Sequence, residues 1–140
     1  MSAALPGVLL VEPQFVLRRT LVSVGRDLSI VAFHEAAHLE RARTLLLAQA
    51  YKGMVLDFQD SERALALLRD LRDGRFATAP DAQVVVIAAV LQPEDEGRLR
   101  HLDVAATLRR PFKISQLLDC LAGLGDRQGA VAAEPVSVAS

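Results

Sequence analysis

Three charged side chains follow short, mainly apolar runs of the chain: Glu12 and Asp57 directly, and Arg110 after one intervening arginine. Carboxylates such as Glu12 and Asp57 can ligate a divalent cation or pair with an arginine. A guanidinium such as Arg110 can hold carboxylate or phosphate oxygens through two parallel hydrogen bonds. Ion pairing, cation binding and phosphate binding are therefore the chemistry open to these residues, if the fold brings them together.

Other reactive residue types occur without the partners that catalysis needs. His34 and His38 are four residues apart and could share one helix face, but no further Cys or His lies nearby to complete a metal site. Cys120 has no histidine partner in its sequence context, so we expect a packing residue. The chain has no Ser-His-Asp or Cys-His pattern in motif context and no glycine-rich phosphate loop, which argues against an enzyme.

Short apolar runs alternate with longer amphipathic stretches, which predicts strands alternating with helices. We expect strands at residues 8–11, 28–33, 54–56, 84–90 and 104–108. We expect helices from Pro13 to about Gly25 and at residues 35–50, 61–74, 94–102 and 114–124. Alternation of this kind builds parallel βαβ units, so the predicted fold class is α/β. The predicted architecture is a doubly wound, flavodoxin-like five-stranded parallel sheet in the order 2-1-3-4-5, flanked by about five helices.

In such a sheet, ligands sit at the carboxyl ends of the strands, where the strand order reverses. Glu12, Asp57 and Arg110 all follow predicted strands, so they should meet at this edge.

Length and composition indicate one domain of 140 residues, with a folded part at residues 1–125 and a disordered tail at residues 126–140. The 16 basic and 17 acidic residues give a net charge of −1, which offers nothing for nucleic acid to bind. The longest apolar run, residues 84–91, is too short to cross a membrane. A single cysteine excludes an intramolecular disulfide, and we expect a cytoplasmic protein.

Four segments, in this order, resemble the receiver domains of bacterial response regulators, the CheY-like family. They are VLLVE at residues 8–12, MVLD at residues 54–57, VVIAA at residues 85–89 and RRPF at residues 109–112. The resemblance covers roughly residues 7–124. It implies an aspartate at the end of the third strand that a histidine kinase phosphorylates with Mg²⁺ as cofactor. Asp57 matches this phosphoacceptor, and the Arg110–Pro111 peptide is expected to be cis.

The other site positions depart from the family. Where the family has an acidic pair, a Thr or Ser, a Lys and a switch aromatic, this chain has Glu12 with Pro13, Ala88, Arg110 and Thr107. Mg²⁺ prefers several hard oxygen ligands, and the proline side chain offers none, so Mg²⁺ binding through Glu12 and Asp57 should be weak. The missing hydroxyl at Ala88 removes a hydrogen bond to a charged group, worth about 1.5–3 kcal/mol.

The predicted function is therefore a degenerate receiver, or pseudo-receiver, of a two-component or phosphorelay system that acts by protein–protein contact. Asp57 is either a weak phosphoacceptor or a leftover carboxylate paired with Arg110. Glu12 is expected to be solvated or paired with a nearby arginine.

Predicted partners are a histidine kinase or another signalling protein. A homodimer through the face of the fourth helix, fifth strand and fifth helix, residues 94–100 and 113–120, is also predicted. The alternative is a small-ligand-binding or enzymatic flavodoxin-like domain.

Overall fold

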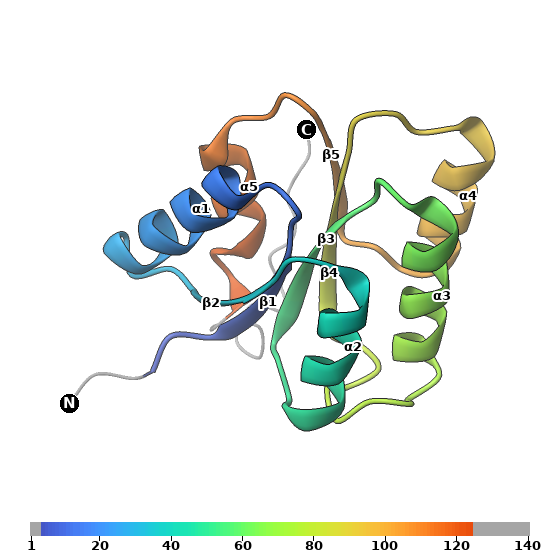
Figure 1. The fold of residues 1–140 in the computed structure, drawn as a ribbon, viewed down its shortest axis with the longest axis horizontal. Helices are drawn as coiled ribbons and strands as arrows, with labels where there is room; N and C mark the ends of the chain where they lie inside the picture. The colour runs from blue at the N-terminus through green and yellow to red at the C-terminus, as the bar shows by residue number, and fades with distance from the viewer. Residues whose placement is uncertain (1–3, 125–140) are drawn as a thin grey trace.

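Five parallel strands form one sheet through the middle of the molecule (Figure 1). The structure is a computed structural model that describes residues 4–124. The strands are β1 (Gly7–Val11), β2 (Ala32–Ala36), β3 (Gly53–Asp57), β4 (Gln83–Ala88) and β5 (Ala106–Arg109). Their order is β2-β1-β3-β4-β5, which confirms the predicted topology.

Helices cover both faces of the sheet. α1 (Phe15–Asp27) and α5 (Ile114–Leu121) lie on one face, and α2 (Leu39–Ala48), α3 (Ser61–Arg72) and α4 (Pro93–His101) lie on the other (Figure 1). Successive strand residues point to opposite faces, so β3 sends Met54 and Leu56 to one apolar cluster and Val55 to the other. Burial on both faces explains why the central strands read as continuous apolar runs.

The region between α1 and α2 differs from the sequence prediction. The predicted strand at residues 28–33 is shifted to Ala32–Ala36, because α1 continues to Asp27 and the chain then turns through Ser29 at a φ of 56°. The predicted helix at residues 35–50 begins only at Leu39, since the His38 side chain accepts the Arg41 N–H at 3.2 Å and caps the helix there.

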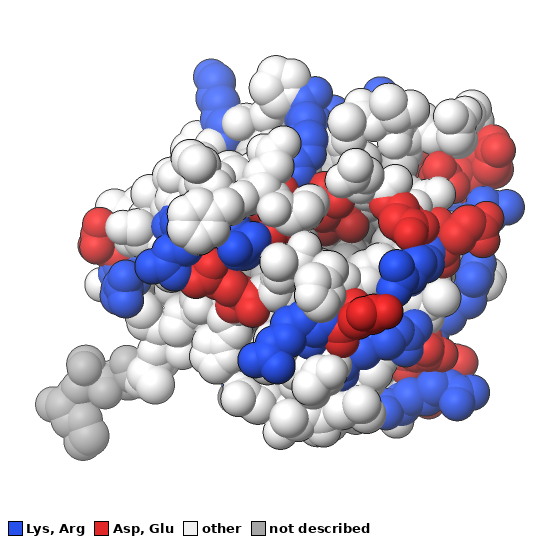
Figure 2. All heavy atoms as spheres, in the orientation of Figure 1, with Lys and Arg blue, Asp and Glu red and all other residues white. Residues whose placement is uncertain are grey.

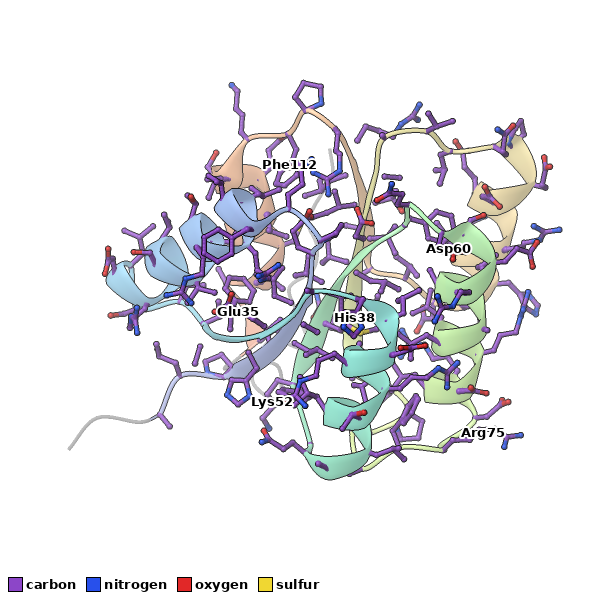
Figure 3. All side chains as sticks on the ribbon, viewed as in Figure 1. Glu35, His38, Lys52, Asp60, Arg75 and Phe112 are labelled. Atoms are coloured by element: carbon purple, nitrogen blue, oxygen red, sulfur yellow. The ribbon has the colours of Figure 1, made fainter. Side chains whose placement is uncertain are left out.

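Local contacts explain other differences. Pro13 precedes the first helix instead of opening it, and Phe15 is 65% exposed, with the Arg18 guanidinium 5.5 Å above its ring. Leu47 of α2 is 60% exposed. Asp60 caps α3 by accepting the Arg63 N–H at 3.2 Å. Asp60 and His38 each mark the start of a helix in Figure 3.

Several smaller points complete the comparison. β5 begins at Ala106 rather than residue 104, and the Arg110–Pro111 peptide is cis, as predicted. The predicted tail at residues 126–140 lies outside the described residues. Within residues 4–124, no helix is both long enough and apolar enough to cross a membrane.

Tyr51, the only tyrosine of the chain, packs just before β3 and is 4% exposed. Its hydroxyl lies 3.1 Å from His34 Nδ1, and the two rings are edge to face. Burial raises the pKa of the Tyr51 phenol above its usual value, and the charge of Arg41 only partly offsets this.

This burial predicts an alkaline loss of stability. Below about pH 10 the phenol is protonated in both the folded and the unfolded chain; above it, the unfolded chain ionises first and the free energy of unfolding falls. Absorbance at 295 nm reports Tyr51 alone, so its midpoint should lie higher in the native protein than in guanidinium chloride. Equal midpoints would contradict the burial of this hydroxyl.

Candidate functional site

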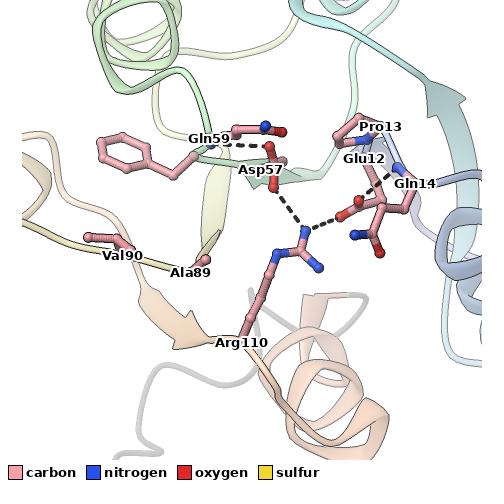
Figure 4. A pocket seen from close by; sticks show the side chains of 9 residues that line it. Glu12, Pro13, Gln14, Asp57, Gln59, Ala89, Val90 and Arg110 are labelled. Atoms are coloured by element: carbon pink, nitrogen blue, oxygen red, sulfur yellow. Dashed lines mark hydrogen bonds and ion pairs between the residues drawn. The ribbon is translucent and has the colours of Figure 1, made fainter.

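The ends of three strands meet at one edge of the sheet (Figure 4). Glu12 follows β1, Asp57 is the last residue of β3 and Arg110 follows β5. Backbone hydrogen bonds extend the sheet to these positions: the Glu12 N–H donates to Ala36 O at 3.0 Å, and the Arg110 N–H donates to Ala88 O at 3.0 Å. The sheet therefore fixes the backbone from which each side chain reaches the site.

One nitrogen of Arg110 joins the two carboxylates. Nη2 of Arg110 donates to Glu12 Oε1 at 2.5 Å and to Asp57 Oδ1 at 2.9 Å. The second oxygen of each carboxylate accepts a backbone N–H two residues along the chain: Gln14 N–H to Glu12 Oε2 at 3.0 Å and Gln59 N–H to Asp57 Oδ2 at 3.1 Å. All four carboxylate oxygens thus have a hydrogen-bond donor (Figure 4).

The cluster is largely shielded from water. The Glu12 side chain is fully buried, Asp57 is 11% exposed and Arg110 is 21% exposed. Burial lowers the pKa of the Arg110 guanidinium, but its hydrogen bonds to Asp57 and Glu12 and their negative charges outweigh burial, and the pKa is raised. Arg110 is therefore a permanent cation between two carboxylates. Of the two alternatives predicted for Glu12, solvation or pairing with a nearby arginine, the structure shows the pairing.

A cavity of about 320 Å³ opens beside this cluster. It is lined by Glu12, Pro13, Gln14, Asp57, Phe58, Gln59, Ala89, Val90 and Arg110. Asp57 also borders a second hollow of about 270 Å³ near the starts of α2 and α3, which includes His38, Asp60 and Arg63. Asp57 thus lies at the crevice where the strand order reverses.

Comparisons with known proteins fit this geometry. No protein-family model matches the chain, and no curated protein matches its sequence. Solved structures do match: a receiver protein from Pseudomonas putida is 26% identical, with a TM-score of 0.73 over 85% of this chain and 97% of that one. The Francisella response regulator 1452 receiver domain is 18% identical, with a TM-score of 0.75 over 88% of this chain and 98% of that one. The chain has the receiver-domain fold of response regulators.

A third similar structure carries information on chemistry. It is a response regulator from Burkholderia pseudomallei, described with a phosphorylated aspartic acid, a calcium ion and citrate. It is 20% identical to this chain, with a TM-score of 0.68 over 95% of this chain and 77% of that one. Likeness at this level of identity establishes the shared fold.

The residues of this receiver fold do not fit a receiver's divalent cation well. Glu12 and Asp57 are brought together, but Arg110 already bonds both of them, and the Pro13 side chain has no oxygen to offer. Across residues 4–124, no group of three or more His, Cys, Asp or Glu is arranged to hold a metal ion. Weak Mg²⁺ binding through Glu12 and Asp57 stays a prediction.

The two predicted switch positions, Ala88 and Thr107, do not line the 320 Å³ cavity beside Asp57. Ala88 ends β4 and is 1% exposed, with its methyl group in the apolar cluster under α2 and α3. Thr107 lies on β5 opposite Val86 and borders a separate groove of about 290 Å³ between α4 and β5. Neither side chain contributes a polar group beside Asp57.

The remaining reactive residues lie away from this site. His34 belongs to β2 and His38 caps α2, so they do not share a helix face as a metal pair would require. Cys120 is half-buried on α5; burial raises the pKa of its thiol, and the charge of Asp119 adds to the effect. A raised pKa suits a packing residue rather than a nucleophile.

Three contributors to the site were missed by sequence reasoning: the N–H groups of Gln14 and Gln59, and the side chain of Arg18. Each of the two N–H groups lies two residues after the carboxylate that it bonds, a local pattern that is common for aspartates such as Asp57. Arg18 donates to Glu12 O at 2.9 Å and to Glu35 Oε1 at 2.9 Å, which ties α1 and β2 to the site. Glu35 lies in β2 beside α1 (Figure 3) and not in the helix predicted at residues 35–50. Nothing in the spacing of Arg18 signals this contact.

Proposed function

We propose that this chain is a pseudo-receiver: a signalling module of a two-component or phosphorelay system that acts by protein–protein contact. In this proposal Asp57 is a vestigial or weak phosphoacceptor. The observation that carries it is the single Arg110 nitrogen bonded to both Asp57 and Glu12.

Phosphorylation of Asp57 would require one of its oxygens to attack phosphorus while cations neutralise the phosphoryl oxygens. Both oxygens of Asp57 are already bonded, one to Arg110 and one to the Gln59 N–H. Attack through Oδ1 would therefore break the ion pair with Arg110, in which the Asp57 side chain is 11% exposed and the Arg110 side chain is 21% exposed. The similar Burkholderia pseudomallei structure carries a phosphorylated aspartic acid. This supports the proposal that Asp57 still accepts a phosphoryl group weakly.

The proposed docking surface is the face of α4, β5 and α5, for a histidine kinase, another signalling protein or a second copy. On α4, the exposed charges are Glu94, Glu96, Arg98 and Arg100. Asp95 does not belong to this set, since it is 6% exposed and accepts the Gln92 N–H at the helix start. Figure 2 draws the face that carries α1, α2 and α3, where basic and acidic side chains are interspersed. The exposed charges of α4 are likewise of both signs, which suits specific pairing at the proposed surface.

A phosphotransfer experiment tests the proposal. The wild-type protein and Asp57→Asn are incubated with acetyl phosphate and Mg²⁺, and the phosphorylated fraction is read by intact mass. We expect wild-type labelling of a few per cent at most, close to the Asp57→Asn background, because Arg110 holds the attacking oxygen. Stoichiometric labelling of wild type that Asp57→Asn abolishes would identify a working phosphorelay receiver instead.

The alternative of a small-ligand-binding or enzymatic flavodoxin-like domain would use the 320 Å³ cavity beside Arg110. No contact among the described residues favours it over a signalling module. A non-enzymatic role, a cytoplasmic location and the absence of nucleic-acid and membrane partners stay predictions.

A further inference from the structure

Arg72 is the last residue of α3. It donates four hydrogen bonds, from its five N–H groups, to backbone carbonyls of two other segments. Nε donates to Leu102 O at 2.8 Å, and Nη2 donates to Asp103 O at 3.1 Å. Nη1 donates to Pro80 O at 2.8 Å and to Ala82 O at 2.7 Å. One guanidinium therefore joins the end of α3, the segment before β4 and the turn between α4 and β5.

The turn that Arg72 holds needs such a contact. Leu102 is the C-cap of α4, and the carbonyls at a helix C-terminus have no partner inside the helix. Asp103, next along the chain, has a φ of 60°, in the left-handed region that costs energy for residues other than glycine. A cation at this end also complements the helix dipole.

α4 has little else to hold it in place. Its buried residues are Asp95 and Leu99, so only one large apolar side chain of the helix is fully buried. Burial lowers the pKa of the Arg72 guanidinium, and the charges of Asp103 and Asp81 oppose this. Because the Arg72 guanidinium is partly desolvated and bonded to four carbonyls, breaking these hydrogen bonds costs free energy.

We infer that Arg72 is a positioning residue that locks the α4–β5 turn against α3 and so fixes the α4 and β5 surface in one arrangement. The position of the α4–β5 turn does not depend on the proposed function. Only the docking role of the α4 and β5 surface rests on it. A lysine cannot replace the contact, because its ammonium group presents its donors from one point and cannot span two segments. Arg72 contacts the C-terminal end of α4, and Asp57 takes no part in this contact.

Hydrogen exchange measured by mass spectrometry on the free protein tests this lock. We compare wild type, Arg72→Lys and Arg72→Met, with Arg69→Met as matched control, since Arg69 is an exposed arginine in the same last turn of α3. In both Arg72 variants, exchange in residues 98–107 should accelerate roughly tenfold or more, with much smaller changes in β1 and β3. Arg69→Met should match wild type.

Unchanged exchange in residues 98–107, or equal acceleration across the sheet, would overturn the inference. So would loss of the fold in both Arg72 variants, because that would make Arg72 a general stability residue. No phosphodonor or partner enters this experiment, so its outcome is independent of the phosphotransfer test.

Discussion

Replacing Arg110 with alanine is expected to lower the free energy of unfolding by about 3 kcal/mol, a large share of the roughly 5–15 kcal/mol that stabilises a typical domain. The physical reason is Glu12, which is fully buried and would lose the cation 2.5 Å from its Oε1. Breaking a buried ion pair by removing one partner leaves an uncompensated charge, which costs more than the pair contributes. Urea unfolding at pH 7 measures the loss.

Two matched variants separate this mechanism from a general effect of losing an arginine. Arg109→Ala removes the exposed neighbour and should change stability by less than about 0.5 kcal/mol. Adding Glu12→Gln to Arg110→Ala should recover part of the loss, because the amide oxygen can still accept the Gln14 N–H and the fully buried charge at position 12 is removed. A loss below about 1 kcal/mol for Arg110→Ala, or no recovery in the double variant, would show that the cluster is not a coupled buried pair.

The second large effect is a gain of phosphorylation when the family's residue types are restored. The triple variant Pro13→Asp, Ala88→Thr, Arg110→Lys supplies a second carboxylate for Mg²⁺, a hydroxyl at the end of β4 and a compact ammonium. The Ala88 methyl lies in the apolar cluster and not in the cavity, so the threonine hydroxyl acts only if it turns away from that cluster towards Asp57. A hydrogen bond from it to a charged phosphoryl oxygen is then worth up to about 3 kcal/mol. Labelling of Asp57 by acetyl phosphate should therefore rise on the order of 100-fold in rate.

The controls for this variant address metal, site and fold. EDTA should remove the gain, and adding Asp57→Asn should abolish it. Ala88 is 1% exposed, so a threonine there can overpack the core, and a version with Ala88→Ser gives the hydroxyl at smaller volume. If both folded versions label no faster than wild type, the departures at positions 13, 88 and 110 are not what limits phosphorylation.

The strand order and the approach of three strand ends were predictable because they follow from local periodicity and from the handedness of βαβ units. Residues 8–11 and 54–57 read as strands by composition alone, and the structure has β1 and β3 there. The stretch from residue 28 to residue 38 was misassigned because its apolar residues fit either a strand or the end of a helix. The His38 cap and the contacts of Glu35 with Arg18 decide it, and both depend on neighbours in space.

The sequence by itself determined the α/β class, the sheet order and the meeting of Glu12, Asp57 and Arg110 at one edge. Tertiary structure alone decided that one Arg110 nitrogen bonds both carboxylates, that Glu12 is fully buried, and that Ala88 and Thr107 lie outside the cavity. The reason is the range of the forces involved. Periodicity is set by neighbours along the chain, while burial and ion pairing depend on side chains up to 98 positions away, as with Arg110 and Glu12.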